Sequence, residues 1–297
     1  MGQTRMSLVT IDGVATECAG LTVWWQLCRK VECARFEKAW QLSGLPQDVL
    51  LAPPSSVAVL ERTMTQLFSD RQTIVKPVKG QEGFYAVLPK GVDGSNLPEY
   101  KTEWTAGVRK VLKGSITEEV LEISSSCPVK TADQLETMFD CNLDTFGSRE
   151  QSQLMTGVVR WLSGARLQQA GKLYFLPPDK VESWRKVEGV LQAASGITTY
   201  EIPALPAKSA MKAVLHAITS EAKDVAMELE EELSGFLRKG TSRQATLDRR
   251  RETAEEMRDK LSYYESFLGE QMTELKDRLD KIALACVKSD LVTSEVI

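Results

Sequence analysis

The sequence predicts an α+β protein with N-terminal helices, an antiparallel β-meander, a small strand–helix–strand unit and a long C-terminal antiparallel helical hairpin. Three patterns support this prediction. Polar and apolar residues alternate between 73 and 123, as in half-buried strands. Two short apolar runs flank a helical stretch between 172 and 202, and a heptad-like seam follows from about 207. We therefore expect units at 1–123, 131–206 and 207–297, with a Ser- and Pro-containing boundary at 124–128.

The N-terminal segment is predicted to hold one strand and one long helix. Ser7–Ile11 precedes Asp12-Gly13, a dipeptide typical of turns, which favours a short strand. A helix is expected from about residue 18 to residue 43. Its apolar residues recur at helical spacing, at Leu21, Trp24, Cys28 and Val31.

Two adjacent tryptophans lie within this predicted helix. On a helix, the side chains of Trp24 and Trp25 point about 100° apart, so both are buried only if the helix is covered on two sides. We interpret both as anchors of the core, because large aromatic side chains are usually packed. The alternative is that one of them contacts a partner chain.

Residues 55–123 are predicted to form a helix followed by the meander. Ser55 or Ser56 caps a helix that runs to about Phe68. Strands are then expected at 73–79, 83–88, 100–108 and 115–123, separated by turns and one looser loop. We expect the longer strands to form a sheet against the N-terminal helix.

The next unit combines helices with two short strands. Helices are predicted at 132–141, 148–170 and 177–194, and strands at 172–176 and 197–202. Ser148 and Gln151 are interpreted as a capping box, in which Gln151 reaches back to the Ser148 amide. The short connections favour a parallel pair of strands with a right-handed crossover.

The C-terminal hairpin has the most sustained pattern. Its two helices meet at a basic, glycine-containing elbow at 238–243, and each is expected to be about 45–60 Å long. Apolar residues recur three or four positions apart, with one stutter at Leu268. The first seam comprises Met211, Val214, Ile218, Ala222, Val225, Leu229, Leu233 and Phe236. The second comprises Ala254, Met257, Leu261, Tyr264, Leu268, Met272, Leu275, Leu279, Ile282 and Cys286.

Several of these features occur together in one order. They are Trp24-Trp25 in an N-terminal helix, Phe36 and Ala39 before a Gly-Leu-Pro at 44–46, a Leu-Tyr-Phe-Leu-Pro strand at 173–177, and a C-terminal coiled coil. This order resembles an uncharacterised family of bacteriophage, plasmid and related mobile-element proteins, over most of the chain. The resemblance implies an accessory protein of a mobile element. It brings no assigned activity and no catalytic residues.

Composition sets broad limits on function. The 297 residues carry a formal net charge of −4, which gives no overall attraction to nucleic acid or to an anionic membrane. The sequence shows no secretory signal, and no apolar run reaches the roughly 18 residues of a membrane span. We expect a soluble cytoplasmic protein, in the host cytoplasm if a phage encodes it, whose six cysteines are reduced.

The sequence offers little for catalysis. It lacks the glycine-rich nucleotide loops, the zinc-protease motif and the serine-hydrolase motif. A single histidine, His216, and cysteines without a C-x-x-C pair are a poor supply for zinc. The acidic run at Glu228 and 230–232 is interpreted as a solvated helix face. We expect no enzymatic activity, cofactor, metal or small-molecule substrate, although scattered acids that converge in space would still form a metal site.

Two functional hypotheses follow. The first is a structural or interaction protein that self-associates, or docks on another protein, through its coiled-coil arm. Tyr263 and Phe267 lie outside the narrow seam and need a cover from the body or from a second copy. With Trp24 and Trp25, they form the candidate protein interface.

The second hypothesis is binding of DNA or RNA at the elbow. Between 238 and 251 there is one acid, Asp248, against six basic residues: Arg238, Lys239, Arg243, Arg249, Arg250 and Arg251. A hairpin tip with this charge would bind phosphates without reading bases. The alternative is that Arg249–Arg251 form ion pairs with Glu252, Glu255 and Glu256 at helical spacing.

Overall fold

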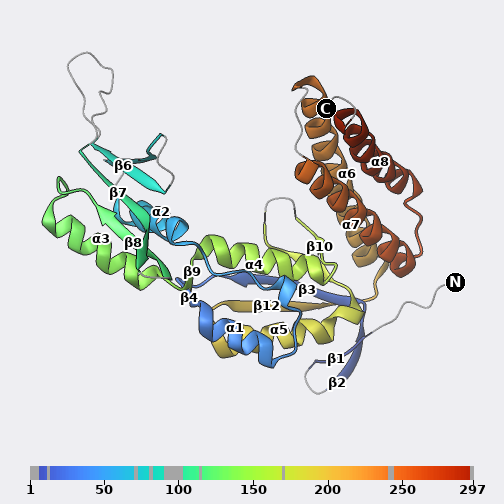
Figure 1. Cartoon of the computed structure of the whole chain (residues 1–297). Coiled ribbons are helices and arrows are strands. Elements are labelled where there is room, and N and C mark those ends of the chain that lie inside the picture. The colour runs from blue at the N-terminus through green and yellow to red at the C-terminus, as the bar shows by residue number, and fades with distance from the viewer. Residues whose placement is uncertain are drawn as a thin grey trace, which may run out of the picture.

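The structure is a computed structural model that describes residues 7–11, 14–69, 73–79, 83–89, 103–113, 116–168, 171–239 and 244–294. The predicted α+β class is confirmed. Three groups of elements follow one another along an elongated molecule (Figure 1). A meander with two helices lies at one end, a helix-covered sheet lies in the middle, and a bundle of three helices stands at the other end.

The middle group is built on an antiparallel sheet of four strands in the order β10-β11-β3-β12. These strands are β3 (Gly20–Gln26), β10 (Ala165–Arg166), β11 (Tyr174–Leu176) and β12 (Thr198–Ala204). The helix expected at 18–43 is therefore wrong over its first half. Leu21, Val23 and Trp25 are buried with a period of two, as a strand requires, although Leu21 and Trp24 also fit a helical period.

The start of β3 requires a glycine. Gly20 has a φ of +150°, and a Cβ there would lie 2.3 Å from the Leu176 carbonyl oxygen and 2.6 Å from the Phe175 ring. Before it, β1 (Ser7–Ile11) and β2 (Val14–Cys18) pair as an antiparallel hairpin, which includes the predicted first strand. The predicted turn at Asp12-Gly13 lies outside the described residues.

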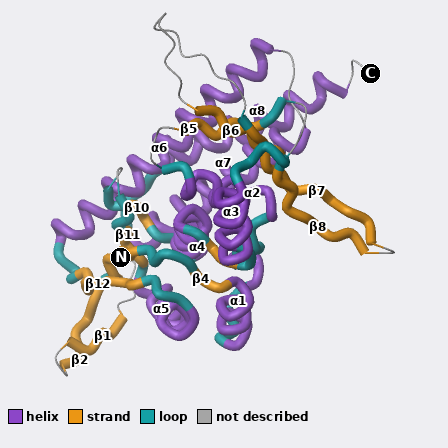
Figure 2. The backbone as a smooth tube through the Cα atoms, turned by 90° about the vertical axis from the view of Figure 1, so that its left-hand side faces the viewer, coloured by secondary structure: helices purple, strands orange, loops and turns teal. Residues whose placement is uncertain are grey.

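Three helices cover one face of this sheet: α1 (Cys33–Leu42), α4 (Ser148–Trp161) and α5 (Val181–Ala194). Figure 2 shows α4, α5 and α1 on the same side of the strands. Their buried residues form one core with β3, which includes Phe36, Trp40, Val158 and Trp184. The 3-10 turn η2 (Pro178–Lys180) leads into α5, so the helix predicted at 177–194 begins with this turn.

The predicted parallel strand pair is wrong. β11 and β12 each pair antiparallel with β3, which lies between them, so they run in the same direction without touching. The strand that separates them comes from the N-terminal segment, more than a hundred residues away in sequence, and no local pattern announces it.

The start and end of α4 also differ from the prediction. Glu150, rather than Gln151, closes the cap, because its Oε2 accepts the Gly147 amide at 2.8 Å. Gln151 is buried, accepts a hydrogen bond from the Cys28 amide and donates one to the Phe146 carbonyl. The helix ends at Trp161, and Ser163 adopts a φ of 54°, so the expected continuation to residue 170 does not form.

The meander is confirmed as a separate antiparallel sheet in the order β5-β6-β7-β8. Its strands are β5 (Thr73–Pro77), β6 (Phe84–Pro89), β7 (Trp104–Lys113) and β8 (Ile116–Ile123). It packs on α2 (Ser56–Leu67) and α3 (Val129–Asn142), and not on the N-terminal helix that was expected to cover it. Ser55 caps α2 by accepting the Ala58 amide at 3.3 Å.

A small connection joins the meander group to the middle group. β4 (Val31–Glu32) pairs with β9 (Thr145–Phe146), and the 3-10 turn η1 (Gln47–Val49) precedes α2. Arg62 of α2 donates to Glu150 at 2.9 Å and to the carbonyl oxygens of Asn142 and Thr145. Because this guanidinium is largely withdrawn from solvent, it fixes α2 against the start of α4.

The C-terminal region is a three-helix bundle rather than a two-helix hairpin. Its helices are α6 (Lys208–Lys239), α7 (Gln244–Leu268) and α8 (Thr273–Ser294). The predicted second helix breaks at the stutter, where Gly269 has a φ of +72° and its amide bonds to the Glu265 carbonyl. Ion pairs from α7 to residues 221 and 232 of α6, and to 276 and 280 of α8, show that α7 runs antiparallel to both.

The predicted seams form the core of this bundle. Of the second seam, all members are buried except Leu268, which is partly buried. Of the first seam, Met211, Val225 and Phe236 are partly buried and the others are buried. The spacing therefore identified the packed face of every helix, and only the number of helices was missed.

The three apolar cores are not continuous in sequence. The middle core joins residues 21–45 to residues 146–197, and the meander core joins residues 59–108 to residues 127–139. Both cores thus draw on residues from each side of the expected boundary at 124–128. The division into the three predicted units stays a prediction.

The buried seam leads to a first prediction. Leu261→Ala removes a fully buried side chain between helices, and is expected to lower the free energy of unfolding by about 2–5 kcal/mol through lost packing and a residual cavity. Ser262→Ala, at the exposed neighbouring position, is the matched control and is expected to change stability by less than about 0.5 kcal/mol. Chemical denaturation followed by circular dichroism measures both. Equal midpoints for the two variants would contradict the seam.

Candidate functional site

The second face of the middle sheet is only half covered. The strand register places Ala165, Phe175, Thr22 and Ile202 in one row across all four strands. Side chains of directly paired residues lie on the same face, which here is the face away from α1, α4 and α5. Ala165 and Phe175 are buried in the bundle core at one end of the row. At the other end, Ile202 is 57% exposed.

We call the uncovered half the open sheet surface, and define it as Thr22, Trp24, Tyr200 and Ile202. Trp24 of β3 pairs with Tyr200 of β12, and their rings stack with centroids 5.4 Å apart and planes 13° apart. Tyr200 is 40% exposed, and Leu205, just after β12, is 56% exposed. Contiguous exposed apolar side chains of this kind are typical of a surface that another molecule covers.

The open sheet surface ends at an edge strand. β12 pairs with β3 on one side, and no other strand among the described residues pairs with its outer side. On the opposite face of β12, Arg185 of α5 donates to Glu201 at 2.6 Å and to Glu188 at 2.9 Å. Burial opposes the charged form of Arg185, but these two carboxylates raise its pKa, so this face carries a paired charge set.

The structure separates the two predicted tryptophans. Trp25 is buried on the helix-covered face and stacks on Tyr174 of β11, with centroids 5.4 Å apart. Trp24 is half-buried on the open face. Adjacent residues of a strand point to opposite faces, so one tryptophan is a core anchor and the other belongs to the open sheet surface.

The other two predicted interface residues are covered by the body of the same chain. The Phe267 ring packs on Phe175, with centroids 5.9 Å apart. The Tyr263 hydroxyl donates to Asp179, and burial together with this carboxylate raises the pKa of Tyr263. The two residues therefore seat the bundle on the sheet, which removes the reason for assigning them to a partner.

Buried polar contacts complete this seat. Lys260 donates to the Gly164 carbonyl and to Glu221, both at 2.7 Å, and Tyr264 donates to the Ser163 carbonyl at 2.8 Å. Burial lowers the pKa of Lys260 although Glu221 opposes the shift, and burial raises the pKa of Tyr264 well above its ordinary value. Every one of these polar groups has a partner, so the arrangement is structural.

The basic elbow is only partly described. The side chains of Arg238 and Lys239 and the whole of Arg243 lie outside the described residues. Arg250 forms an ion pair with Glu232 of α6 at 2.5 Å, which the sequence did not predict. Arg251 lies 3.8 Å from Glu255, as the ion-pair alternative predicted, and 3.8 Å from Asp248. Arg249 has an exposed side chain.

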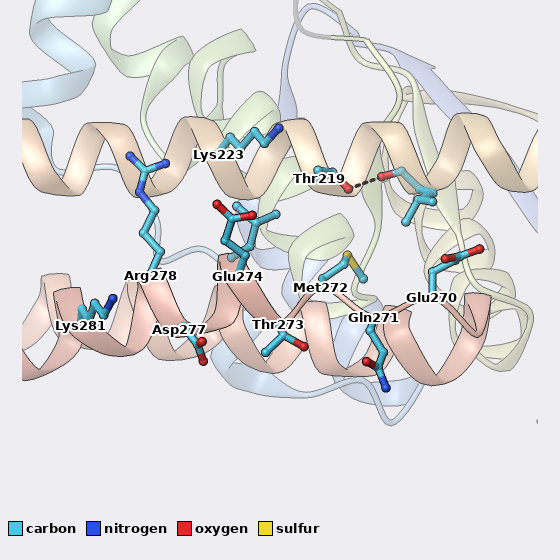
Figure 3. Close-up of a pocket in the computed structure, with 12 residues that line it drawn as sticks. Thr219, Lys223, Glu270, Gln271, Met272, Thr273, Glu274, Asp277, Arg278 and Lys281 are labelled. Carbon is cyan, nitrogen blue, oxygen red and sulfur yellow. Dashed lines mark hydrogen bonds between the residues drawn. The ribbon is translucent and has the colours of Figure 1, made fainter.

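A groove of about 640 Å³ lies between α6 and the start of α8 (Figure 3). Glu274 and Arg278 point toward α6 in this view, whereas Gln271 and Asp277 point away. Arg278 is held by Glu230 through two hydrogen bonds of 2.6 and 2.7 Å. The lining contains acids and bases in equal number, so its charge selects neither an anion nor a cation.

The described residues gather no site for metal chemistry. Among them, no three His, Cys, Asp or Glu side chains come together as a metal ion would require. His216 is exposed on α6, and all six cysteines are free thiols. Burial raises the pKa of Cys33 to about 11, which disfavours its thiolate. In the described part of the chain, no helix is long and apolar enough to cross a membrane.

The family to which the chain belongs is shown by a match that spans all three groups of elements. DUF6744, a family of unknown function, matches residues 20–293, from the first residue of β3 into the end of α8. The chain belongs to this family. No curated protein and no solved structure matches the DUF6744 chain. The expected membership of an uncharacterised family is confirmed, and the mobile-element origin stays a prediction.

The open sheet surface was missed at the sequence level, although a signal existed. The strand at 197–202 was predicted, and its Tyr200 and Ile202 alternate with Thr199 and Glu201. That alternation indicates a strand with one apolar face. What was missing was the position of β12 at a sheet edge, next to a strand from the N-terminal segment.

The turn between α7 and α8 gives a second prediction. Glu265 accepts the Met272 amide and pairs with Lys276 at 2.6 Å, and these bonds, the Lys276 bond foremost, lower its pKa. Its contribution to stability is therefore present above about pH 4.5 and is lost as the pH falls further. In this DUF6744 protein, Glu265→Gln should lower the free energy of unfolding by about 1 kcal/mol at pH 7.

The loss in the same variant should shrink as the pH falls below 4.5 and disappear at a pH low enough to protonate the wild-type carboxyl as well. The matched control is Glu256→Gln, which removes an exposed carboxylate from the same helix and is expected to have little effect across this pH range. Denaturant melts across the same range measure the difference. A loss for Glu265→Gln that does not change with pH would show that charge has no part in this turn.

Proposed function

We propose that this DUF6744 protein is a non-enzymatic interaction protein that self-associates. The single observation that carries the proposal is the row of side chains that begins under the bundle at Ala165 and ends in solvent at Ile202. The same sheet face is a packed core at one end and an uncovered apolar surface at the other. A second copy of the chain carries the same apolar surface and is therefore able to cover it.

The packing of the arm supports this choice of surface over the coiled coil. The seam that favoured association through the arm is filled by the three helices of the chain itself. Tyr263 and Phe267 are covered by β11 and η2. Apolar area already buried within one chain contributes nothing further to an association. Self-association through the sheet leaves the helical bundle free to bind another protein at the end that lies away from the sheet.

The contacts of the polar residues support a non-enzymatic role. Lys260, Lys276 and Arg278 are each held by a carboxylate at 2.6–2.7 Å. Groups engaged in this way fix helices against one another. From the resemblance to phage and plasmid proteins, we further propose that the protein is an accessory protein of a mobile element. It would then act in the cytoplasm of the host cell.

The alternative function is phosphate binding at the elbow, and the exposed Arg249 is the observation that favours it. Arg250 and Arg251 weaken it, because their charges are already partly balanced by Glu232 and Glu255. Arg249→Gln is the appropriate variant, since it removes a charge without breaking either ion pair. A true phosphate site would bind DNA or RNA with an affinity that falls steeply with salt and falls again in this variant.

The test of the proposed function is the mass of the protein in solution. Light scattering coupled to gel filtration, over about a hundredfold range of concentration, is expected to show particles heavier than the 33.0 kDa chain. Addition of short DNA or RNA at low salt is expected to leave that mass unchanged. A monomer at every concentration would overturn self-association, and a salt-sensitive complex that Arg249→Gln weakens would establish the alternative.

A further inference from the structure

No strand in the described part of the chain pairs with the outer side of β12, so its outward backbone groups are available to a further strand. The Ala204 carbonyl accepts the Ala19 amide at 2.8 Å, so the backbone groups of Ala204 point toward β3. Alternate residues of a strand point their backbone groups to opposite sides, which turns those of Thr199, Glu201 and Pro203 outward. Pro203 fits this assignment, because a residue without an N–H group is tolerated where its nitrogen faces away from the neighbouring strand.

Another open edge in the molecule, β8, carries more charged side chains than β12. It holds Glu118, Glu119 and Glu122 within eight residues, and Glu122 and Glu119 form ion pairs with Arg109 and Lys110 of β7 at 2.9 and 3.7 Å. Charged side chains on an edge strand disfavour the addition of a further strand. β12 carries a single acid, Glu201, which Arg185 already balances. Of these two edges, β12 has fewer charged side chains and also carries the exposed Tyr200 and Ile202, so it is the better candidate to accept a further strand.

We propose that two copies of the chain pair through β12, antiparallel and around a two-fold axis at Glu201. This inference rests on the proposed self-association and names its surface. An antiparallel pairing of a strand with itself is the isologous contact that two-fold symmetry requires. The result is a continuous sheet of eight strands, which runs from β10 of one copy to β10 of the other.

This register uses the available backbone groups. Glu201 and the partner's Glu201 exchange two N–H···O=C hydrogen bonds across the axis. Thr199 donates its amide to the carbonyl of the partner's Pro203, and the symmetric bond forms in the other copy. The missing N–H of Pro203 thus leaves only one carbonyl per chain without a donor.

The side chains agree with the same register. On the open face, Tyr200 lies opposite the partner's Ile202, which makes two aromatic–β-branched pairs beside the Trp24 rings. On the other face, the two Glu201 carboxylates meet, each with its own Arg185 guanidinium at 2.6 Å. Each Arg185 also pairs with Glu188 at 2.9 Å, so a guanidinium shared by two carboxylates lies on each side of the axis. The two α5 helices then become neighbours in the helix layer, since each lies over its own β12.

The first measurement is the effect of a charge on this surface. Ile202→Glu sets each new carboxylate against an apolar side chain of the partner, and the dimer dissociation constant is expected to rise at least about 100-fold. Ile202 is exposed in the single chain, so folding should be retained, and circular dichroism checks this. Leu42→Glu is the matched control, because Leu42 is 80% exposed and lies at the end of α1, far from β12 in sequence and not in the sheet.

The second measurement tests the register by a disulfide at the axis. Glu201→Cys brings two thiols to a directly paired position, with Cα atoms about 5.5 Å apart, within the range that a disulfide spans. Thr198→Cys is the matched control on the same strand, since residue 198 and its copy would lie about 20 Å apart. Both variants carry Cys28→Ser and Cys141→Ser, which remove the two native thiols that are not buried. Oxidised glutathione is the oxidant, and non-reducing electrophoresis gives the yield.

The expected result is a wild-type dimer that Ile202→Glu dissociates and Leu42→Glu does not, with cross-linking by Glu201→Cys and not by Thr198→Cys. A dimer that Ile202→Glu leaves intact, or equal cross-linking by the two cysteine variants, would overturn this interface while self-association stands. A monomeric wild type at every concentration would overturn both proposals.

Discussion

The structure depends on the central strand β3, which is hydrogen-bonded to another strand along each of its two edges. β3 pairs with β11 on one edge and β12 on the other, and its Leu21, Val23 and Trp25 anchor the core under α4 and α5. Its alternate residues supply the opposite face, where Trp24 stacks on Tyr200. Without β3, β12 has no pairing partner among the described strands and β11 keeps only the two-residue β10, so the helices that follow them have no common surface to cover.

The bundle is attached to this sheet by a combination of apolar and polar contacts. Phe267 packs on Phe175 while Lys260 and Tyr264 bond to carbonyl oxygens in the turn before β10. Polar groups buried in this way are costly unless paired, and each is paired, so they fix the orientation of the bundle. The consequence for function is geometrical. The bundle covers the β10–β11 end of the open face and leaves the β12 end to solvent.

Much of the architecture is predictable because it is local. The alternation that predicts the meander and the three-to-four spacing that predicts the bundle seams act between residues a few positions apart. The cap of α2 was predicted as Ser55 or Ser56, because a capping hydroxyl needs to reach only three residues along the chain, and Ser55 does so by accepting the Ala58 amide. The candidate site was predicted only in fragments. Trp24 was a predicted interface residue, but it was placed on a helix and not on a strand. Tyr200 and Ile202 were correctly assigned to a strand, but their exposed apolar face was not predicted.

By itself, the sequence determined the fold class, the packed faces of the C-terminal helices and the four-stranded meander, because each depends on a periodicity that one segment contains. The tertiary structure alone decided that residues 20–26 form a strand. Their aromatic and β-branched side chains suit either period, and the choice depends on β11 and β12, which are about 150 and 175 residues away. It also decided where the predicted second C-terminal helix breaks. The chain reverses at Gly269 because the segment after it packs as a third helix in the bundle core. Pairing partners and covered faces are relations between distant segments, and no single segment carries them.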